Sequence, residues 1–353
     1  MFKSLSKKIA IDLGAATIRL LMIDEQNTQA WESINSDWST RVIEEAACVA
    51  RQKASGKIIA VGQAALAMRG RLEKEVEIIF PFVESRLIDK EAAIFLLNNL
   101  LKRAFNQYLV IQPEVMVVSA AQISDLDKQL LTELFDELGF SKIYLVAAPL
   151  AAAIGAGVPV ADASGACLLH MGASCVEAAV IGLGSVLFLT HSNQAGQWLD
   201  KEIIEFLQQG ENLLIGCEAA SQLKQTLLNL DFDNISPAKL EVVGQTAKQH
   251  LPQSLHVKSK DLEPIAVLAR QEYTTLVEAL LQRIPPDLSV DILHKGLLLT
   301  GGLAKTQGLE VFLSQHFKFP VARMEDAAQL AIIGAATLLA NIKLFEGRLE
   351  YGK

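Results

Sequence analysis

Apolar runs along this chain repeatedly end in turns built from small residues. Residues 9–24, IAIDLGAATIRLLMID, predict a strand, a tight turn from Gly14 to Ala16, and a second strand. Residues 167–190 repeat this order, and LLLTGG at 297–302 places two glycines directly after a third apolar strand. Turns with such small side chains let the backbone approach a phosphate, so we expect three candidate phosphate contacts.

Between the first two turns the pattern alternates between helix and strand. Residues 89–105 have an acidic start and a wide apolar face, which predict a long helix. A buried strand at 114–121 follows, and then a helix with Ser124 as N-cap and Gly139 just past its end. A further strand is predicted at 142–149. This order is typical of an α/β domain.

The remaining pattern predicts a small inserted part and further helices. Short strand-like runs between residues 27 and 70 suggest the inserted subdomain. Helices are predicted at 196–209, at 217–230, and from about 262 to 283, where Pro285 and Pro286 stop the last of them. Since the hairpins at 9–24 and 167–190 are alike, we expect two related halves with a nucleotide between them.

Composition and charge narrow the classes of function. A chain of 353 residues that is 51% hydrophobic and 20% charged is long enough for about two folded domains. Its net charge of −8 argues against a nucleic-acid partner, which needs a basic surface. The 4 cysteines lack metal-ligand spacing, and no apolar run reaches the roughly 18 residues of a membrane span. We therefore expect a cytoplasmic protein.

Two stretches nevertheless suit a membrane surface. At the N-terminus, Met1, Phe2 and Leu5 stand among lysines, as in a segment that lies at a lipid interface. A solvated tail before the first strand explains the same residues. Between the helix at 89–105 and the next strand, Tyr108 and Leu109 are placed to insert into a membrane or, equally, to pack on that helix.

The order of the three turns resembles that of the actin, Hsp70 and sugar-kinase superfamily. Within it the chain most resembles the bacterial actin family MreB. The most specific match is IYLVAAPLAAAIGAGVPV at 143–160. It is supported, in the family's order and spacing, by IAIDLG at 9–14, NLLIG at 212–216, LLLTGG at 297–302 and FPVARMEDA at 319–327.

The resemblance implies an α/β, actin-like fold of two related halves around a nucleotide cleft, each with a core and a smaller outer subdomain. The implied subdomains are IA (1–32, 79–147 and 327–353), IB (33–78), IIA (148–190 and 253–326) and IIB (191–252). It also implies ATP or ADP with Mg²⁺ in the cleft. The implied partners are further copies of the chain or another actin homologue in a filament, and the inner-membrane surface with its membrane proteins.

By the same resemblance, nucleotide binding is assigned to the three turns and to two neighbouring helices. The residues concerned are Asp12, Gly14, Ala15, Ala16, Thr17, Gly172, Ala173, Ser174, Gly196, Ser221, Lys224, Gly301, Gly302 and Leu303. Asp12 is the one position that the resemblance leaves for the metal.

Carried over residue by residue, the groups for hydrolysis are altered. His170 stands where the family has an acidic residue that helps to hold hydrated Mg²⁺, and Cys175 replaces a threonine near the attacking water. Ala148 replaces a glutamate that positions or activates that water. Because alanine cannot orient a water or accept its proton, we expect no catalytic residue here, and a loss of about 10²–10⁴ in hydrolysis rate.

Further departures affect nucleotide contacts. The family's GTANT reads GAATI here, so Thr17 stands where asparagine is usual. Gln197 replaces an aspartate, Ser221 replaces a glutamate expected to reach the ribose, and Leu303 replaces a glycine, whereas Lys224 is kept. The accumulated changes indicate a degenerate site in which nucleotide binding is weak or absent.

His170 and Cys175 each have an alternative chemical interpretation. His170 fills a vacated pocket, contacts a phosphate directly, or ligates a metal, although no second His or Cys has suitable spacing. Cys175 as a redox nucleophile lacks an identifiable partner thiol or base.

The sequence therefore predicts an MreB-like filament protein at the inner face of the cell membrane, with weak or absent ATP hydrolysis. Two alternatives remain: an active ATP-dependent dynamic filament, and a non-polymerising actin-fold membrane adaptor. A sugar kinase is disfavoured because no catalytic aspartate stands in a recognisable sugar-binding loop.

Overall fold

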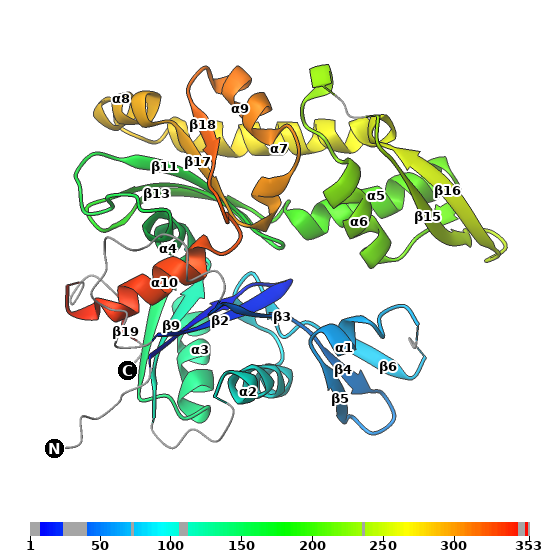
Figure 1. Ribbon diagram of the computed structural model, residues 1–353, viewed down its shortest axis with the longest axis horizontal. Helices are drawn as coiled ribbons and strands as arrows, with labels where there is room; N and C mark the ends of the chain where they lie inside the picture. Colours follow the sequence, from blue (N-terminus) through cyan, green and yellow to red (C-terminus); the bar gives the residue numbers. More distant parts are fainter. Residues whose placement is uncertain are drawn as a thin grey trace. The chain divides into compact units, whose positions relative to one another are not determined.

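The structure is a computed structural model that describes residues 8–23, 41–71, 74–105, 112–234, 237–344 and 350–351. Packing divides the chain into two units, each formed from separate stretches of sequence (Figure 1). The first unit comprises residues 1–163, 181–187 and 329–353, and the second comprises residues 164–180 and 188–328. The finer division into four subdomains stays a prediction.

A mixed six-stranded sheet organises the first unit, in the order β19-β10-β9-β1-β2-β3. Its strands are β1 (Lys8–Leu13), β2 (Thr17–Ile23), β3 (Ile43–Ala46), β9 (Glu114–Ser119), β10 (Lys142–Ala147) and β19 (Glu350–Tyr351). β1 and β2 form the predicted antiparallel hairpin, and β1 also pairs in parallel with β9. The first small-residue turn therefore connects two central strands of the sheet.

Helices cover both faces of this sheet. Ile9, Ile11 and Leu13 of β1 belong to one apolar core with the buried faces of α2 (Lys90–Phe105) and α3 (Asp125–Glu137). Successive strand residues point to opposite faces, so Ala10, which is also buried, faces the other side. On that side α10 (Leu330–Ala340) contacts β1, β2 and β9 and packs on α4 (Ala148–Gly155).

The close packing of α4 against α10 depends on two glycines. A Cβ on Gly334 would lie 1.8 Å from the carbonyl oxygen of Ala151, and one on Gly155 would lie 2.0 Å from that of Leu330. No side chain fits at such distances, so the two helix backbones are in direct contact. α4 itself begins at Ala148, one of the altered positions.

The predicted helix boundaries in the first unit are confirmed. Ser124 is the N-cap of α3, and its side chain accepts a hydrogen bond from the backbone N–H of Asp127. Gly139 has a φ of +88°, the left-handed conformation expected just past a helix end. Asp89 precedes α2 and accepts a hydrogen bond from the N–H of Ala92.

The inserted part forms a three-stranded sheet in the order β5-β4-β6. It contains β4 (Val49–Gln52), β5 (Ile58–Val61), β6 (Val76–Ile79) and the short helix α1 (Gln63–Leu66), with a small hairpin of β7 (Phe82–Val83) and β8 (Arg86–Leu87) beyond it. The apolar run at 41–50 supplies strands to two different sheets, since β3 and β4 are separated only by Ala47 and Cys48.

A five-stranded sheet in the order β13-β12-β11-β17-β18 belongs to the second unit except for residues 181–187, where β12 ends and β13 begins. Its strands are β11 (Ala166–Met171), β12 (Val176–Gly182), β13 (Ser185–Ser192), β17 (Leu297–Thr300) and β18 (Val321–Arg323). β11 pairs in parallel with β17, so the turns that follow these two strands lie at the same edge of the sheet.

The helices of this unit are α5 (Gly196–Gly210), α6 (Cys217–Leu227), α7 (Glu263–Leu281), α8 (Pro286–Lys295) and α9 (Leu309–Phe317). α5 and α6 pack together beside the small sheet β14-β15-β16, formed by β14 (Leu213–Leu214), β15 (Lys239–Thr246) and β16 (Pro252–Lys258). Short 3-10 helices span Phe232–Asn234, Ser259–Leu262, Gly302–Lys305 and, in the first unit, Ile342–Leu344.

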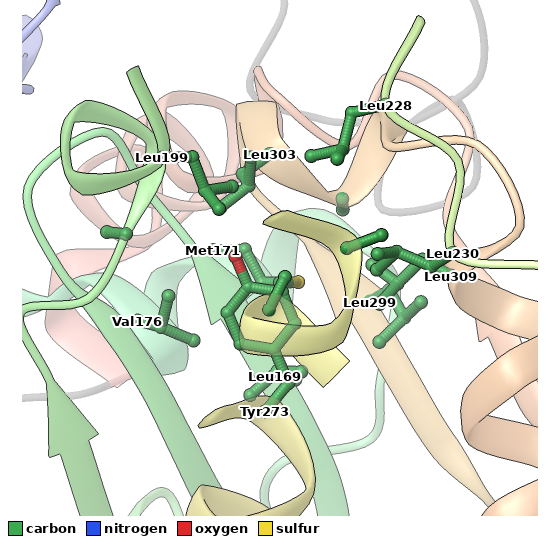
Figure 2. Packing of buried hydrophobic residues seen from close by; sticks show 14 of the residues in the cluster. Leu169, Met171, Val176, Leu199, Leu228, Leu230, Tyr273, Leu299, Leu303 and Leu309 are labelled. Carbon is green, nitrogen blue, oxygen red and sulfur yellow. The ribbon is translucent and has the colours of Figure 1, made fainter. Parts of the chain in front are cut away.

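The core of the second unit lies directly beneath its turns. Figure 2 shows the ring of Tyr273, from α7, beside Leu169 and Met171 of β11, with Leu299 of β17 and Leu303 nearby. Burial of this cluster holds the strand ends, and therefore the turns, in place. Of the helices within the described ranges, none is long and apolar enough to cross a membrane.

Candidate functional site

The first turn is closed by its own backbone. A Cβ on Gly14 would lie 2.4 Å from the carbonyl oxygen of Thr17, so this position requires glycine. The carbonyl oxygen of Ala16 accepts a hydrogen bond of 3.0 Å from the N–H of Ala47, and Ala15 is buried. The predicted turn therefore keeps its shape without the side-chain donors that the family places there.

An ion-paired row of side chains runs across the strands beside this turn. Asp12 lies opposite Arg19 in the β1–β2 register, and Arg19 lies opposite Glu44 in the β2–β3 register. The Nη1 of Arg19 is 3.4 Å from Oδ2 of Asp12, and its Nε donates to Oε1 of Glu44 at 2.7 Å. The Nε2 of Gln329 lies 3.4 Å from the same Glu44 oxygen. Sequence reasoning named Asp12 and missed its partners.

Burial dominates the electrostatics of Asp12. It raises the pKa of this carboxyl above its ordinary value, while the charge of Arg19 and its hydrogen bond act in the opposite direction. The side chains of Arg19 and Asp12 are only 16% and 15% exposed. Burial therefore disfavours the ionised carboxylate, and Arg19 is the main group that favours it.

The second turn is joined to the start of α5. The N–H of Gly172 donates to the carbonyl oxygen of Cys175 at 2.9 Å, and the N–H of Gln197 donates to that of Ala173 at 2.7 Å. The N–H of Gly196 donates to Gly172 at 3.3 Å. These bonds bring together Gly172, Ala173 and Gly196, which sequence reasoning had assigned to the nucleotide.

Lys224 of α6 supplies a cation at this junction. Its Nζ donates to the carbonyl oxygen of Gly196 and lies 2.7 Å from Oδ1 of Asp200, with both side chains largely buried. Asp200 was missed by sequence reasoning, although it lies one helical turn beyond Gly196 on α5. Ser221 lies on α6, and its hydroxyl accepts a hydrogen bond from Gln225 at 3.2 Å.

His170 is hydrogen-bonded to the neighbouring strand. It lies opposite Thr300 in the β11–β17 register, and its Nδ1 is 3.0 Å from the hydroxyl oxygen of Thr300. The imidazole is half-buried. Cys175, at the end of the turn that follows β11, is also half-buried. In the part of the chain that the structure describes, no group of three or more His, Cys, Asp and Glu residues could hold a metal ion.

The third turn packs against β11. Gly301 has a φ of +87°, and a Cβ there would lie 2.4 Å from the carbonyl oxygen of Met171. At Gly302 the corresponding direction is open. The side chain of Leu303 is buried in the core below the turn (Figure 2), so this replacement for a glycine points into the protein.

Comparison with known proteins identifies the family. Residues 6–347 match the family described as MreB/Mbl protein. The chain belongs to this family. It is 28% identical over 340 residues to the cell shape-determining protein Mbl of Bacillus subtilis (strain 168), and the match covers 96% of this chain and 97% of Mbl.

Solved structures of related proteins show an actin-like fold. MreB5 of Spiroplasma citri bound to AMPPNP superposes with a TM-score of 0.88 at 22% identity, over 97% of this chain and 98% of MreB5. The MamK double helical filament gives a TM-score of 0.74 at 15% identity, over 94% of this chain and 98% of MamK. The predicted fold class and family are therefore confirmed.

The residues present fit a nucleotide phosphate better than they fit Mg²⁺. In the second unit, two tight glycine turns at one sheet edge bring backbone groups together as anions require, and Lys224 is held beside the second turn, with its charge paired to Asp200. Mg²⁺ prefers oxygen ligands, but in the first unit the carboxylate of Asp12 is already paired with Arg19, and in the second unit His170 offers an imidazole nitrogen and not an oxygen. The donor set therefore does not match the metal that the family implies.

Proposed function

We propose that this chain is a cytoskeletal protein of the MreB type, which forms actin-like filaments or joins those of another actin homologue. Support comes from the family match over residues 6–347 and from the similarity to a relative that was solved as a double helical filament. The curated relative Mbl is named as cell shape-determining. A role in cell shape is therefore the first biological process to test.

Hydrolysis of ATP by this filament is weak or absent. The observation that carries this part is Ala148, the first residue of α4, where the side chain is a buried methyl group. No carboxylate at this helix start is available to orient water, and losing such a group typically lowers the rate by about 10²–10⁴. Subunit contacts depend on broad surfaces, so assembly survives a change that removes catalysis.

In this proposal the chain still binds a nucleotide, although it hydrolyses ATP weakly or not at all. MreB5, the structural relative above, was solved with AMPPNP. The turns at Gly172 and Gly301 keep the tight glycine backbone for which anion binding is expected, and Lys224, paired with Asp200, lies at the start of α5 beside the second turn. The nucleotide, ATP or ADP, then acts as a structural ligand.

We further propose that the protein lies at the inner face of the cell membrane. The support is the N-terminal arrangement of Met1, Phe2 and Leu5 among lysines, with Tyr108 and Leu109 as a second contact. These five residues lie outside the described ranges. Flotation with vesicles of anionic and of neutral lipid, using the full chain and a Phe2→Asp/Leu5→Asp variant, tests this part. Equal flotation of both proteins would argue against it.

One experiment addresses assembly and hydrolysis together. The purified chain is pelleted at rising concentration with ADP, ATP or no nucleotide, while released phosphate is measured in the same samples. We expect pelletable polymer with little phosphate release. Polymer with steady phosphate release would favour the dynamic ATPase filament, and no polymer at any concentration would favour the membrane adaptor.

A variant at α4 tests why hydrolysis is weak. Ala148→Glu restores a carboxylate at a helix N-terminus, where the backbone favours negative charge, and is expected to raise phosphate release by up to about 10²-fold. Ala156→Glu, at the C-cap of the same helix, is the matched control and should leave release unchanged. If both variants behave alike, Ala148 does not account for the loss.

A further inference from the structure

The hairpin of the first unit contains a cation of its own. Arg19 stands on β2 directly opposite Asp12, three residues beyond the tight turn at Gly14 to Ala16. Its guanidinium contacts Asp12 through one nitrogen and Glu44 through another. The register of three neighbouring strands fixes both contacts, so the guanidinium is held in one place.

We propose that Arg19 substitutes for the divalent cation at Asp12, so that nucleotide binding by this chain does not require Mg²⁺. This inference rests on the nucleotide binding proposed above. Arginine suits the role because its guanidinium is always charged and presents several N–H donors in a fixed plane. A resident side chain in this position is present at every magnesium concentration.

Three features of the row favour this role over that of an ordinary surface ion pair. Asp12 and Arg19 are largely buried, so water screens their charges little. Glu44 accepts a hydrogen bond from Nε of Arg19 and a second one from Gln329, so the carboxylate that holds the outer side of the guanidinium is itself held in place. A dication brought next to Asp12 would also be repelled by the adjacent guanidinium.

The same unit offers a matched comparison. Arg51 pairs with Asp89 at 2.9 Å and with Glu91 at 3.3 Å, so it too bridges two carboxylates and is mostly buried. It lies on β4 of the inserted part, away from the hairpin strands β1 and β2. Removing Arg51 therefore changes net charge and frees two carboxylates without touching Asp12.

The test measures the affinity for a fluorescent ATP analogue in EDTA and in Mg²⁺, for the full chain and its variants. For the unaltered chain we expect dissociation constants within about twofold of each other in the two conditions. Arg19→Leu should bind about tenfold more weakly in EDTA and recover in Mg²⁺, because one charge-assisted contact is lost and then replaced. Arg51→Leu should behave like the unaltered chain, and Arg19→Lys, which keeps the charge without the planar set of donors, should bind in EDTA with an affinity between those of Arg19→Leu and the unaltered chain.

The possible results separate this inference from the proposed function. A tenfold or greater loss of affinity by the unaltered chain in EDTA would overturn the inference and leave nucleotide binding intact. A variant Arg19→Leu that is merely less stable, with no new Mg²⁺ dependence, would also overturn it and assign Arg19 a structural role. If Arg19→Leu does not fold, Arg19→Gln, which keeps hydrogen-bonding groups without the charge, takes its place.

If the analogue binds in neither condition, the proposed nucleotide binding is wrong. The role of Arg19 is then tested by the binding of Mn²⁺ alone. Free Mn²⁺ is then counted by electron paramagnetic resonance in the presence of each protein. If Arg19→Leu binds more Mn²⁺ than the unaltered chain and Arg51→Leu do, the result supports the proposal that the Arg19 side chain takes the place of a divalent cation. Equal binding by all three proteins overturns it.

Discussion

Asp12 and Arg19 are cross-strand partners in the β1–β2 hairpin, with Nη1 of Arg19 at 3.4 Å from Oδ2 of Asp12. Each compensates the charge of the other in a largely buried position. We expect Arg19→Leu to lower the free energy of unfolding by about 1–3 kcal/mol, because it leaves the buried Asp12 carboxylate without its partner, whereas Asp12→Asn should change it little, because Arg19 stays paired with Glu44. The double variant should recover part of that loss.

Urea denaturation of the four proteins, analysed as a double-mutant cycle, checks this coupling. Losses that simply add in the double variant would show that the two side chains do not stabilise each other.

Replacing Gly334 by alanine is predicted to destabilise the protein, although a Gly→Ala change within a helix usually stabilises it. In an exposed helix, alanine is more stable than glycine by about 0.5–1 kcal/mol. A Cβ at Gly334 would, however, lie 1.8 Å from the carbonyl oxygen of Ala151. Gly334→Ala should therefore lower stability by about 1–3 kcal/mol, or more if α4 and α10 separate. The thermal midpoint measures this, with Gly210→Ala, where the added methyl meets nothing within 4 Å, as the control.

Removal of the Tyr273 hydroxyl is predicted to stabilise the protein. Its side chain lies in the core of the second unit (Figure 2), and the hydroxyl has no hydrogen-bond partner among the described residues. Burial raises the pKa of this phenol. Tyr273→Phe should increase the free energy of unfolding by about 1 kcal/mol, because a buried unpaired group is unfavourable.

The control for this change is Tyr144→Phe. Tyr144 is also buried, but within the described residues its hydroxyl is not one of the buried side-chain atoms that lack a hydrogen-bond partner. A gain in both variants would indicate that the effect is general to tyrosine in these cores.

The four cysteines are predicted to differ in reactivity and to affect alkaline stability. Burial raises the pKa of Cys48 from 9.0 to about 11 and that of Cys167 to about 12. At pH 8, iodoacetamide should modify only Cys175 and Cys217 in the native protein, since both are half-exposed. Intact-mass measurement counts the labels, and all four cysteines should react in urea. Rapid labelling of Cys48 or Cys167 would contradict their burial.

The sign of the pH dependence follows from the raised pKa values of these thiols. Between pH 9 and about 11 the folded protein keeps the proton of Cys48 while the unfolded chain loses it. The unfolded chain then binds fewer protons, so stability is full below about pH 9 and falls as the pH rises. Cys48→Ala should reduce this alkaline loss. An unchanged slope between pH 9 and 11 would show that other groups cause it.

Much of the fold could be predicted because its signals are local. Ser124 and Gly139 mark the ends of α3 through contacts within a few residues, and the β1–β2 hairpin follows from apolar runs around one tight turn. By contrast, α10 is buried along nearly its whole length, so its sequence carries no alternation of polar and apolar faces. The helix α8 was also missed, because Pro286 was interpreted only as a stop and not as a helix start.

The sequence by itself determined which chemical groups the protein has. By its resemblance to the family, it has Ala148, His170 and Cys175 at positions where groups for hydrolysis are expected, and it keeps Asp12 and Lys224. Only the tertiary structure decided which charges meet: Asp12 with Arg19, and Lys224 with Asp200. The physical reason is that strand register and helix packing bring side chains together, and neither is written in local periodicity.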